Sequence, residues 1–359
     1  MNGPTAAPSG AASQFVRTAL QGAIPAMRLL FKPDTVAQLP RLFGEGFAPV
    51  RRMFVQAHNN YYLARMLDQP ETITFVTSAN RSGNTWMRYL ICDVLLQNTG
   101  VQTTTELPVD HLDIIPSYYE KLLARTKTSV PAPGRLIMTH FTIPLVQQLV
   151  GGDARVRKWR YLYLYRTPED TLVSYFYLHL REKYIRSKCG GNIDFFCLEM
   201  LPGWVEHVTS FLDALDGGVD IHLACYGEML RDPNGVLRET LRWLGIPFTD
   251  GMVARANANM QFSNLKAMEA RNKGRNETDR SHHSSPRAGA EKVPFFRQGR
   301  EGGGAAELKP ETLSKIRSVA GPVFTRANEL LARQKLKCQS EGGAGAGSEP
   351  QGRPHNSVE

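Results

Sequence analysis

A short apolar segment, followed by a small polar loop and a helical pattern, constrains this chain more than any other stretch. Residues Thr72–Thr77 are apolar or β-branched and predict a strand. The loop after it contains Arg81 and Gly83 and leads into a predicted helix, in which Trp86 and Leu90 lie one turn apart. Free backbone N–H groups and the helix dipole favour an anion at such a helix N-terminus. The segment therefore predicts a phosphate-binding loop.

The loop is not a Walker A sequence. It has no lysine and lacks the Gly-x-x-x-x-Gly-Lys-Ser/Thr spacing. No carboxylate clearly follows a strand to hold Mg²⁺. A P-loop kinase or another nucleotide-dependent phosphotransferase is therefore disfavoured, but it stays open as an alternative.

A second strand–helix junction lies about 80 residues further on. Tyr161–Tyr165 predicts an aromatic and aliphatic strand that Arg166 closes. Pro168–Asp170 is typical of a first helical turn, with a proline early and acids near the N-terminus. Ser174 follows about two turns into this helix. In open α/β sheets, ligands bind at the carboxyl ends of the strands, where Arg166 is expected.

The alternation of strands and helices predicts the fold class. Strand candidates at 72–77, 135–139, 160–166 and 219–225 are separated by helical patterns. This order predicts an α/β fold in which helices flank both faces of a parallel sheet. The chain has 359 residues, of which 42% are hydrophobic, enough for one sizeable core. We expect a single domain.

The two junctions resemble the cofactor motifs of sulfotransferases that use 3′-phosphoadenosine 5′-phosphosulfate (PAPS). The family's Tyr-Pro-Lys-Ser-Gly-Thr-Thr-Trp loop is similar to Ala79–Trp86. Its Arg-Asn-Pro-x-Asp-x-x-Val-Ser motif is similar to the segment from Arg166 to Ser174. The resemblance implies the P-loop NTPase-like sulfotransferase fold and places the 3′-phosphate on Arg166 and Ser174. It implies a 5′-phosphate held by the loop residues Arg81, Ser82, Gly83, Asn84 and Thr85, with Trp86 stacked against the adenine.

Further segments match the family in order, so the resemblance covers about residues 70–333. Tyr226 stands where the family has a tyrosine near the adenine, and Phe262 where it has Ser-Phe-x-x-Met-Lys. Arg297-Gln298-Gly299 resembles the Arg-Lys-Gly loop that closes on the 3′-phosphate, with Gln298 in place of the lysine.

The resemblance also implies two catalytic residues. The family's general base lies in Lys-Thr-His, which corresponds to Met138-Thr139-His140. A neutral imidazole suits proton removal from an acceptor hydroxyl at cellular pH. Arg81 replaces the family lysine that stabilises the bridging oxygen of the leaving phosphate. Because Met138 and Gln298 each replace a lysine, a catalytically weak nucleotide-binding protein on the same fold remains a second alternative.

The predicted activity needs the co-substrate PAPS and no metal. The five cysteines are scattered, and neither a Cys-x-x-Cys pair nor a zinc-type spacing is present. The net charge of +9 would suit nucleic acid, but no RNA-recognition or zinc-finger pattern occurs. An anionic nucleotide explains the charge. The expected reaction is transfer of a sulfuryl group from PAPS to a hydroxyl, or alternatively an amine, of a small molecule that the sequence does not identify. A homodimer is left open.

The ends of the chain predict two accessory segments. Residues 1–50 are predicted to be an N-terminal extension that is partly disordered or serves targeting, and residues 340–359 a disordered tail. No apolar run of 18 residues occurs, so no transmembrane anchor is expected. The expected location is the cytoplasm. The alternative is an organelle reached through a transit segment, because residues 15–32 are amphipathic and basic.

Overall fold

The computed structural model describes residues 73–105, 115, 135–150, 156–180, 189–272 and 293–343. The strands are β1 (Ile73–Ser78), β2 (Arg135–Thr139), β3 (Arg160–Tyr165) and β4 (Ile221–Cys225). The helices are α4 (Asn84–Asn98), α6 (Ile143–Val150), α8 (Pro168–Leu180), α10 (Ile193–Asp216), α11 (Tyr226–Arg231), α12 (Pro233–Leu244), α13 (Asp250–Asn259), α14 (Phe262–Asn272), the 3-10 turn η3 (Ala305–Glu307) and α15 (Pro310–Gly343). All four strands fall where the sequence predicts them, to within two residues.

The four described strands form one parallel sheet in the order β2-β1-β3-β4. In this register, Val76 in β1 lies opposite Met138 in β2 and Leu162 in β3. Parallel strands end at the same edge of a sheet, so the loops that follow all four strands meet there. The predicted parallel α/β fold is confirmed.

Side chains along β3 alternate between two cores, one on each face of the sheet. Tyr161, Tyr163 and Tyr165 point into one core, while Leu162 and Leu164 point into the other. Both sets are buried, as expected for a strand in a sheet that helices cover on both faces. This is why the strand is continuously aromatic or aliphatic in sequence instead of alternating with polar residues.

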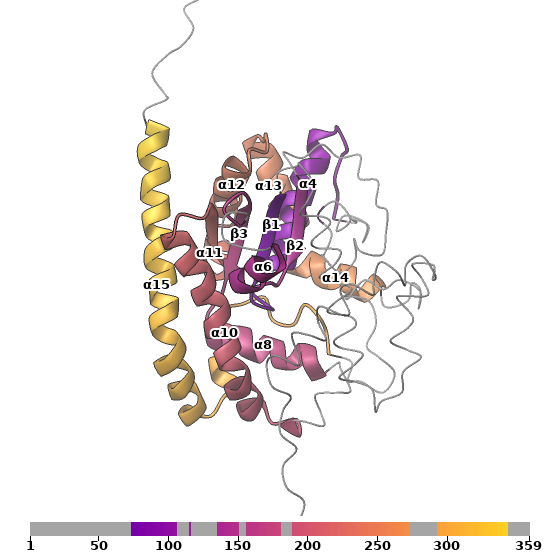
Figure 1. The fold of residues 1–359 in the computed structure, drawn as a ribbon. Helices are drawn as coiled ribbons and strands as arrows, with labels where there is room; N and C mark the ends of the chain where they lie inside the picture. Colours follow the sequence, from indigo (N-terminus) through magenta and orange to yellow (C-terminus); the bar gives the residue numbers. More distant parts are fainter. Residues whose placement is uncertain are drawn as a thin grey trace, which may run out of the picture.

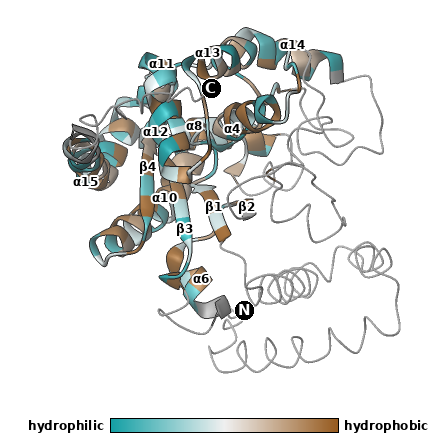
Figure 2. Ribbon diagram, turned by 90° about the horizontal axis from the view of Figure 1, so that it is seen from above, coloured by the Kyte–Doolittle hydropathy of each residue, from teal (hydrophilic) through white to brown (hydrophobic). Residues whose placement is uncertain are grey.

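Helices cover both faces of the sheet, as predicted. Residues of α6, α8, α10 and α15 belong to the first core, and residues of α4, α12, α13 and α14 belong to the second. Figure 1 shows the sheet in the centre of the molecule and α15 along one side, next to α10. Figure 2 shows hydrophobic and hydrophilic colours on the same helices α10 and α12, as expected of helices with one face on a core.

The chain order places a ligand position between β1 and β3. After β1 the chain turns into α4, on the second face of the sheet, whereas after β3 it turns into α8, on the first face. Two neighbouring strands whose helices leave toward opposite faces create a crevice at their carboxyl ends, and ligands of open α/β sheets bind there. Both predicted phosphate motifs border this crevice.

Helix α15 protects the outer edge of the sheet. The side chain of Gln334 accepts a hydrogen bond from the Leu223 amide of β4 over 3.0 Å, and its own amide lies 3.4 Å from the Leu223 carbonyl. The Gln334 amide thus pairs with the edge strand as a neighbouring strand would, and the edge is covered against further pairing.

The predicted terminal segments lie mostly outside the described residues. Both the predicted N-terminal extension, residues 1–50, and the last residues, 344–359, lie outside the described residues. The predicted tail begins at Ser340, and α15 continues through that position to Gly343. Within the described ranges, no helix is both long and apolar enough to span a lipid bilayer.

Candidate active site

The loop between β1 and α4 takes a conformation that depends on Gly83. This glycine precedes the first turn of α4 with φ 98°, in the left-handed region. A Cβ atom there would lie 2.6 Å from Cδ2 of Tyr226, so the tyrosine ring fills the space that the missing side chain leaves. Arg81 is also left-handed, at φ 72°, which is uncommon for a residue with a side chain.

The N-terminus of α4 is open to an anion. None of its first-turn residues is acidic, and no side chain of the described residues caps it. The Asn84 amide is turned toward the sheet, where it donates to the Val76 carbonyl over 3.2 Å and to Ser78 Oγ over 3.3 Å. Asn84 therefore ties the helix to β1 through its side-chain N–H groups, which turn away from the helix N-terminus.

Arg81 connects the two predicted phosphate motifs. Its Nε donates to Ser174 Oγ of α8 over 3.0 Å, and one of its terminal nitrogens donates to the Phe295 carbonyl over 2.6 Å. The guanidinium also lies over the Phe295 ring, with 4.2 Å between its central carbon and the ring centroid. The positive charge of Arg81 thus lies in the crevice between α4 and α8.

Arg166 lies at the carboxyl end of β3, as predicted. Its guanidinium covers the ring of Tyr226 at 4.4 Å, donates to the Arg300 carbonyl over 3.0 Å, and lies 3.5 Å from the Asp170 carboxylate. Burial raises the pKa of Tyr226, and the nearby charges of Arg166 and Arg81 oppose that rise. The tyrosine is therefore a neutral platform for the arginine.

Several buried polar atoms near this crevice have no hydrogen-bond partner among the described residues. Those that can donate to an anion include Ser82 Oγ, Arg166 Nε and Thr167 Oγ1. A buried polar group without a partner costs about 1–3 kcal/mol, so such groups are rare unless a ligand or water completes them. Two hydroxyl groups and a guanidinium N–H can all donate to the oxygens of a phosphate.

The predicted 3′-phosphate loop lies beside α8 and is held by Glu307. Arg297 donates to one oxygen of the Glu307 carboxylate over 2.6 Å, and Gln298 donates to the same oxygen over 3.1 Å. The Tyr177 hydroxyl donates to the other oxygen over 2.6 Å, and the Arg297 guanidinium lies over the Tyr177 ring at 4.1 Å. Gly299 has φ 62° and packs against the ring of Phe262 so closely that a Cβ would overlap it.

Asp170 fixes the continuation of this loop, and the sequence did not reveal that role. Its carboxylate is buried and accepts backbone hydrogen bonds from Gly302 over 2.8 Å and from Gly304 over 2.6 Å. Because Asp170 also neighbours Arg166, one carboxylate organises both sides of the predicted 3′-phosphate site. The sequence had placed Asp170 only as a first-turn acid of the helix.

The predicted adenine side consists of aromatic residues from three elements. The indole N–H of Trp86 donates to the Met260 carbonyl over 3.1 Å, and its ring meets Tyr226 edge-on with 6.0 Å between centroids. Phe262 begins α14, and Lys266 Nζ lies 5.1 Å from the centre of its ring. Trp86 and Phe262 thus pack against the second core, and Tyr226 meets the Trp86 ring at the crevice.

His140 follows β2 and lies at the same edge of the sheet. Its Nδ1 is 2.8 Å from the Ser78 carbonyl at the end of β1. A carbonyl only accepts hydrogen bonds, so Nδ1 carries the proton and Nε2 of the neutral ring carries the lone pair. The side chain is half-buried. It therefore has the tautomer that a general base acting through Nε2 requires.

The chain has further aromatic side chains that are candidates to line an acceptor pocket. Phe176 and Phe196 are buried in the first core, while Phe195 is largely exposed. Tyr118 and Tyr119 lie outside the described residues. Around the crevice and throughout the described ranges, no three His, Cys, Asp or Glu side chains are grouped so as to hold a metal ion.

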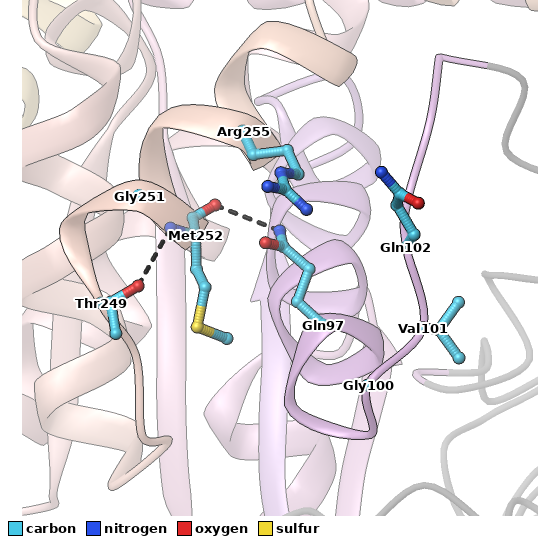
Figure 3. A pocket seen from close by; sticks show the side chains of 8 residues that line it. All are labelled: Gln97, Gly100, Val101, Gln102, Thr249, Gly251, Met252 and Arg255. Carbon is cyan, nitrogen blue, oxygen red and sulfur yellow. Dashed lines mark hydrogen bonds between the residues drawn. The ribbon is translucent and has the colours of Figure 1, made fainter.

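A separate hollow of about 380 Å³ lies far from the crevice, between the C-terminal end of α4 and the start of α13. Figure 3 shows Gln97, Met252 and Arg255 among its lining residues. Helix α4 spans 15 residues, or about 22 Å, and the phosphate loop lies at its other end. This hollow is therefore not part of the candidate site.

Comparisons with known proteins agree with this geometry. A family model described as "Sulfotransferase domain" matches residues 71–333. Flavonol 3-sulfotransferase of Flaveria bidentis is 23% identical over 311 residues, which cover 79% of this chain and 94% of that protein. Cytosolic sulfotransferase 7 of Arabidopsis thaliana is 24% identical over 266 residues, which cover 69% and 77%.

A solved structure supports the fold. The crystal structure of a mouse sulfotransferase complexed with PAP (3′-phosphoadenosine 5′-phosphate) aligns with a TM-score of 0.50 and 19% sequence identity. The alignment covers 79% of this chain and 94% of that one. The family match spans most of the chain, including the loop after β1, His140, Arg166 and Arg297. The chain therefore belongs to the sulfotransferase domain family, and it is a sulfotransferase.

Proposed function

We propose that this enzyme transfers a sulfuryl group from PAPS to a hydroxyl of a small molecule, with His140 as the general base. The observation that carries the proposal is the set of unpaired polar atoms at the crevice, Ser82 Oγ, Arg166 Nε and Thr167 Oγ1. These groups lie where two strand–helix turns meet. They suit a ligand with more than one phosphate, such as PAPS.

The two phosphate positions draw on different residues. On the α4 side, Arg81 and the backbone N–H groups from Ser82 to Thr85 suit the 5′-phosphosulfate, because the helix N-terminus has no competing acid. On the α8 side, Arg166, Ser174 and Arg297 suit the 3′-phosphate, with Gln298 and Gly299 beside them. The Glu307 carboxylate accepts a hydrogen bond from the Arg297 guanidinium over 2.6 Å and so aligns Arg297 for that phosphate contact.

The chain's own residues act on the acceptor proton and on the developing charge. PAPS, when bound, supplies the sulfuryl group and a phosphate leaving group. His140 Nε2 removes the hydroxyl proton, while the Ser78 carbonyl holds the opposite nitrogen and fixes the ring. Arg81 supplies positive charge where the leaving phosphate gains negative charge, which stabilises the transition state more than the ground state.

The acceptor is proposed to be a small hydroxylated molecule, without a more specific identity. One relative is named for a flavonol and another for luciferin, which makes small ring compounds a reasonable starting set. Several relatives are named cytosolic, and a cytosolic location is proposed for this enzyme on that basis.

Transfer of radiolabelled sulfur from PAPS to a panel of phenols, flavonols, steroids and sugars tests the proposal. We expect labelled product from at least one acceptor, and an unchanged rate with EDTA because no metal takes part. A metal-dependent transfer of phosphate would favour the phosphotransferase alternative. Tight binding of PAP, the product 3′-phosphoadenosine 5′-phosphate, without transfer to any acceptor would favour a nucleotide-binding protein.

The proposed contact of Arg166 with the 3′-phosphate can be tested against a matched control variant at the opposite end of β3. Arg166 follows the end of β3 and Arg160 begins it, and both guanidiniums cover an aromatic ring, at 4.4 and 4.1 Å. Arg166→Ala should weaken PAP binding by about 1.5–3 kcal/mol, the value of a charge-assisted hydrogen bond, and should affect AMP little. Arg160→Ala should leave both affinities unchanged. Equal losses for PAP and AMP with Arg166→Ala would make Arg166 a structural residue.

A further inference from the structure

A second histidine contacts the segment that carries His140. His207 lies on α10, 67 residues further along the chain, and its Nε2 is 3.2 Å from the His140 backbone carbonyl. Its Nδ1 is 3.0 Å from the hydroxyl of Tyr163 in β3. His207 thus joins the core of the sheet to the residue that holds the base.

The chemistry of the two partners sets the direction of both hydrogen bonds. The His140 carbonyl only accepts, so Nε2 of His207 donates; Nδ1 of the neutral ring then accepts from the Tyr163 hydroxyl. Burial, together with the nearby His140, lowers the pKa of His207 to about 4. The ring is therefore neutral at physiological pH, and the tyrosine selects the tautomer that donates to His140.

The His207 ring has little freedom to move. It stacks on Tyr163 with 5.7 Å between centroids and on Phe211 with 5.5 Å, at interplanar angles of 22° and 21°. Tyr163 and Phe211 also stack on each other, at 4.1 Å. All three side chains are buried in the first core. A rigid aromatic stack thus presents one N–H group to the His140 carbonyl.

We propose that His207 is a positioning residue for the base: it holds the His140 backbone so that the imidazole stays aligned for proton removal. The inference rests on the proposed role of His140. The Ser78 carbonyl holds the ring of His140, and His207 holds its main chain. Because both the ring and the main chain of His140 are held, the direction in which Nε2 points is set by Ser78 at the end of β1 and by His207 on α10.

The inferred role predicts a loss in turnover and little change in nucleotide affinity. The two side-chain hydrogen bonds of His207 reach Tyr163 and the His140 carbonyl, which are outside the two phosphate motifs. Misplacing a catalytic group by about 1 Å can cost about 10²-fold in rate. We therefore expect His207→Phe, which keeps an aromatic ring and removes both hydrogen bonds, to lower kcat about 10- to 100-fold. His207→Gln, which keeps an N–H donor at a similar reach, should recover most of that loss.

A matched control separates positioning from stability. His222 is also buried, its pKa is also lowered to about 4, and it also stacks on an aromatic ring, Trp243. It lies near the amino end of β4, away from the crevice. His222→Phe should reduce the free energy of unfolding as His207→Phe does, but should leave kcat unchanged. A similar fall in kcat for both variants would overturn the inference.

The decisive measurement is a double-mutant cycle between His140 and His207. If His207 acts through His140, His207→Phe should lower kcat in the wild-type background and have no effect in the His140→Ala background. The same fold-change in both backgrounds, or unchanged kcat with His207→Phe alone, would overturn the positioning role. Failure of the underlying function would be visible separately, because His140→Ala would then retain activity near the wild-type level.

Discussion

Asp170 provides the sharpest test of how the crevice is organised. Its carboxylate accepts the Gly302 and Gly304 amides at 2.8 and 2.6 Å and lies 3.5 Å from Arg166. The loop fits closely here, since a Cβ on Gly304 would lie 2.6 Å from the Glu169 carbonyl oxygen. Asp170 therefore anchors the continuation of the Arg297 loop at Gly302 and Gly304, while Glu307 holds Arg297 itself.

The change Asp170→Asn keeps the shape and removes one acceptor and the charge. The asparagine oxygen can keep one backbone hydrogen bond, which weakens by about 1 kcal/mol as it becomes neutral. The new NH₂ group faces the second backbone N–H, and that unpaired buried donor costs about 1–3 kcal/mol. The loop should therefore lose about 2–4 kcal/mol of anchoring, which corresponds to an affinity for PAP about 30- to 1,000-fold weaker if binding requires the loop in this position.

Calorimetric titration with PAP and AMP, together with urea unfolding, measures this effect. We expect a large loss for PAP, a small one for AMP, and a lower free energy of unfolding. Asp220→Asn is the matched control, since Asp220 accepts from Arg160 and Trp243 at the opposite end of β3 and is half-exposed. The reasoning is refuted if Asp170→Asn binds PAP as tightly as Asp220→Asn does.

Two further predictions concern the loop and the buried histidines. Gly83→Ala should reduce stability by about 1–2 kcal/mol through its left-handed backbone alone, and it should weaken PAP binding further because its Cβ displaces Tyr226. Titration of the purified variant with PAP checks this, and affinity at the wild-type level would contradict it. The pKa values of His207 and His222 are about 4 in the folded protein, below the value of 6.5 of an unperturbed histidine. The unfolded chain therefore binds more protons below pH 6.5, and each histidine should cost about 2 kcal/mol of stability at pH 5 relative to pH 7. Urea unfolding at both pH values measures the loss, and His222→Gln should remove about half of it; a stability that does not change between the two pH values would contradict the assignment.

The sequence predicts the sheet well because each strand is buried on both faces. In β3 the five buried residues Tyr161–Tyr165 are all apolar or aromatic, and that pattern is visible without any structure. The loop after β1 could be predicted for a different reason. Its turn into α4 has a left-handed backbone at position 83, and the glycine that this conformation favours stands in the sequence.

The supporting residues of the site could not be predicted in the same way. These supporting residues, Asp170, Glu307 and His207, act through contacts with residues elsewhere in the chain. Asp170 and Gly302, for example, are 132 positions apart. An acid in a first helical turn or a histidine on a helix face has an ordinary explanation in sequence. Only the packing of α8, α10 and the loop before α15 brings these side chains to the crevice. The same packing directs the Arg81 side chain to Ser174, a contact that the spacing of the two motifs does not indicate.

In the proposed mechanism, His140 removes the acceptor proton while other residues hold the nucleotide. Sulfuryl transfer from PAPS and PAP affinity, measured on the same preparation of His140→Ala, test this division of roles. We expect kcat to fall by about 10²–10⁴-fold while the dissociation constant for PAP stays within about twofold of wild type. Transfer within a few-fold of the wild-type rate would contradict it, because another group would then be the base.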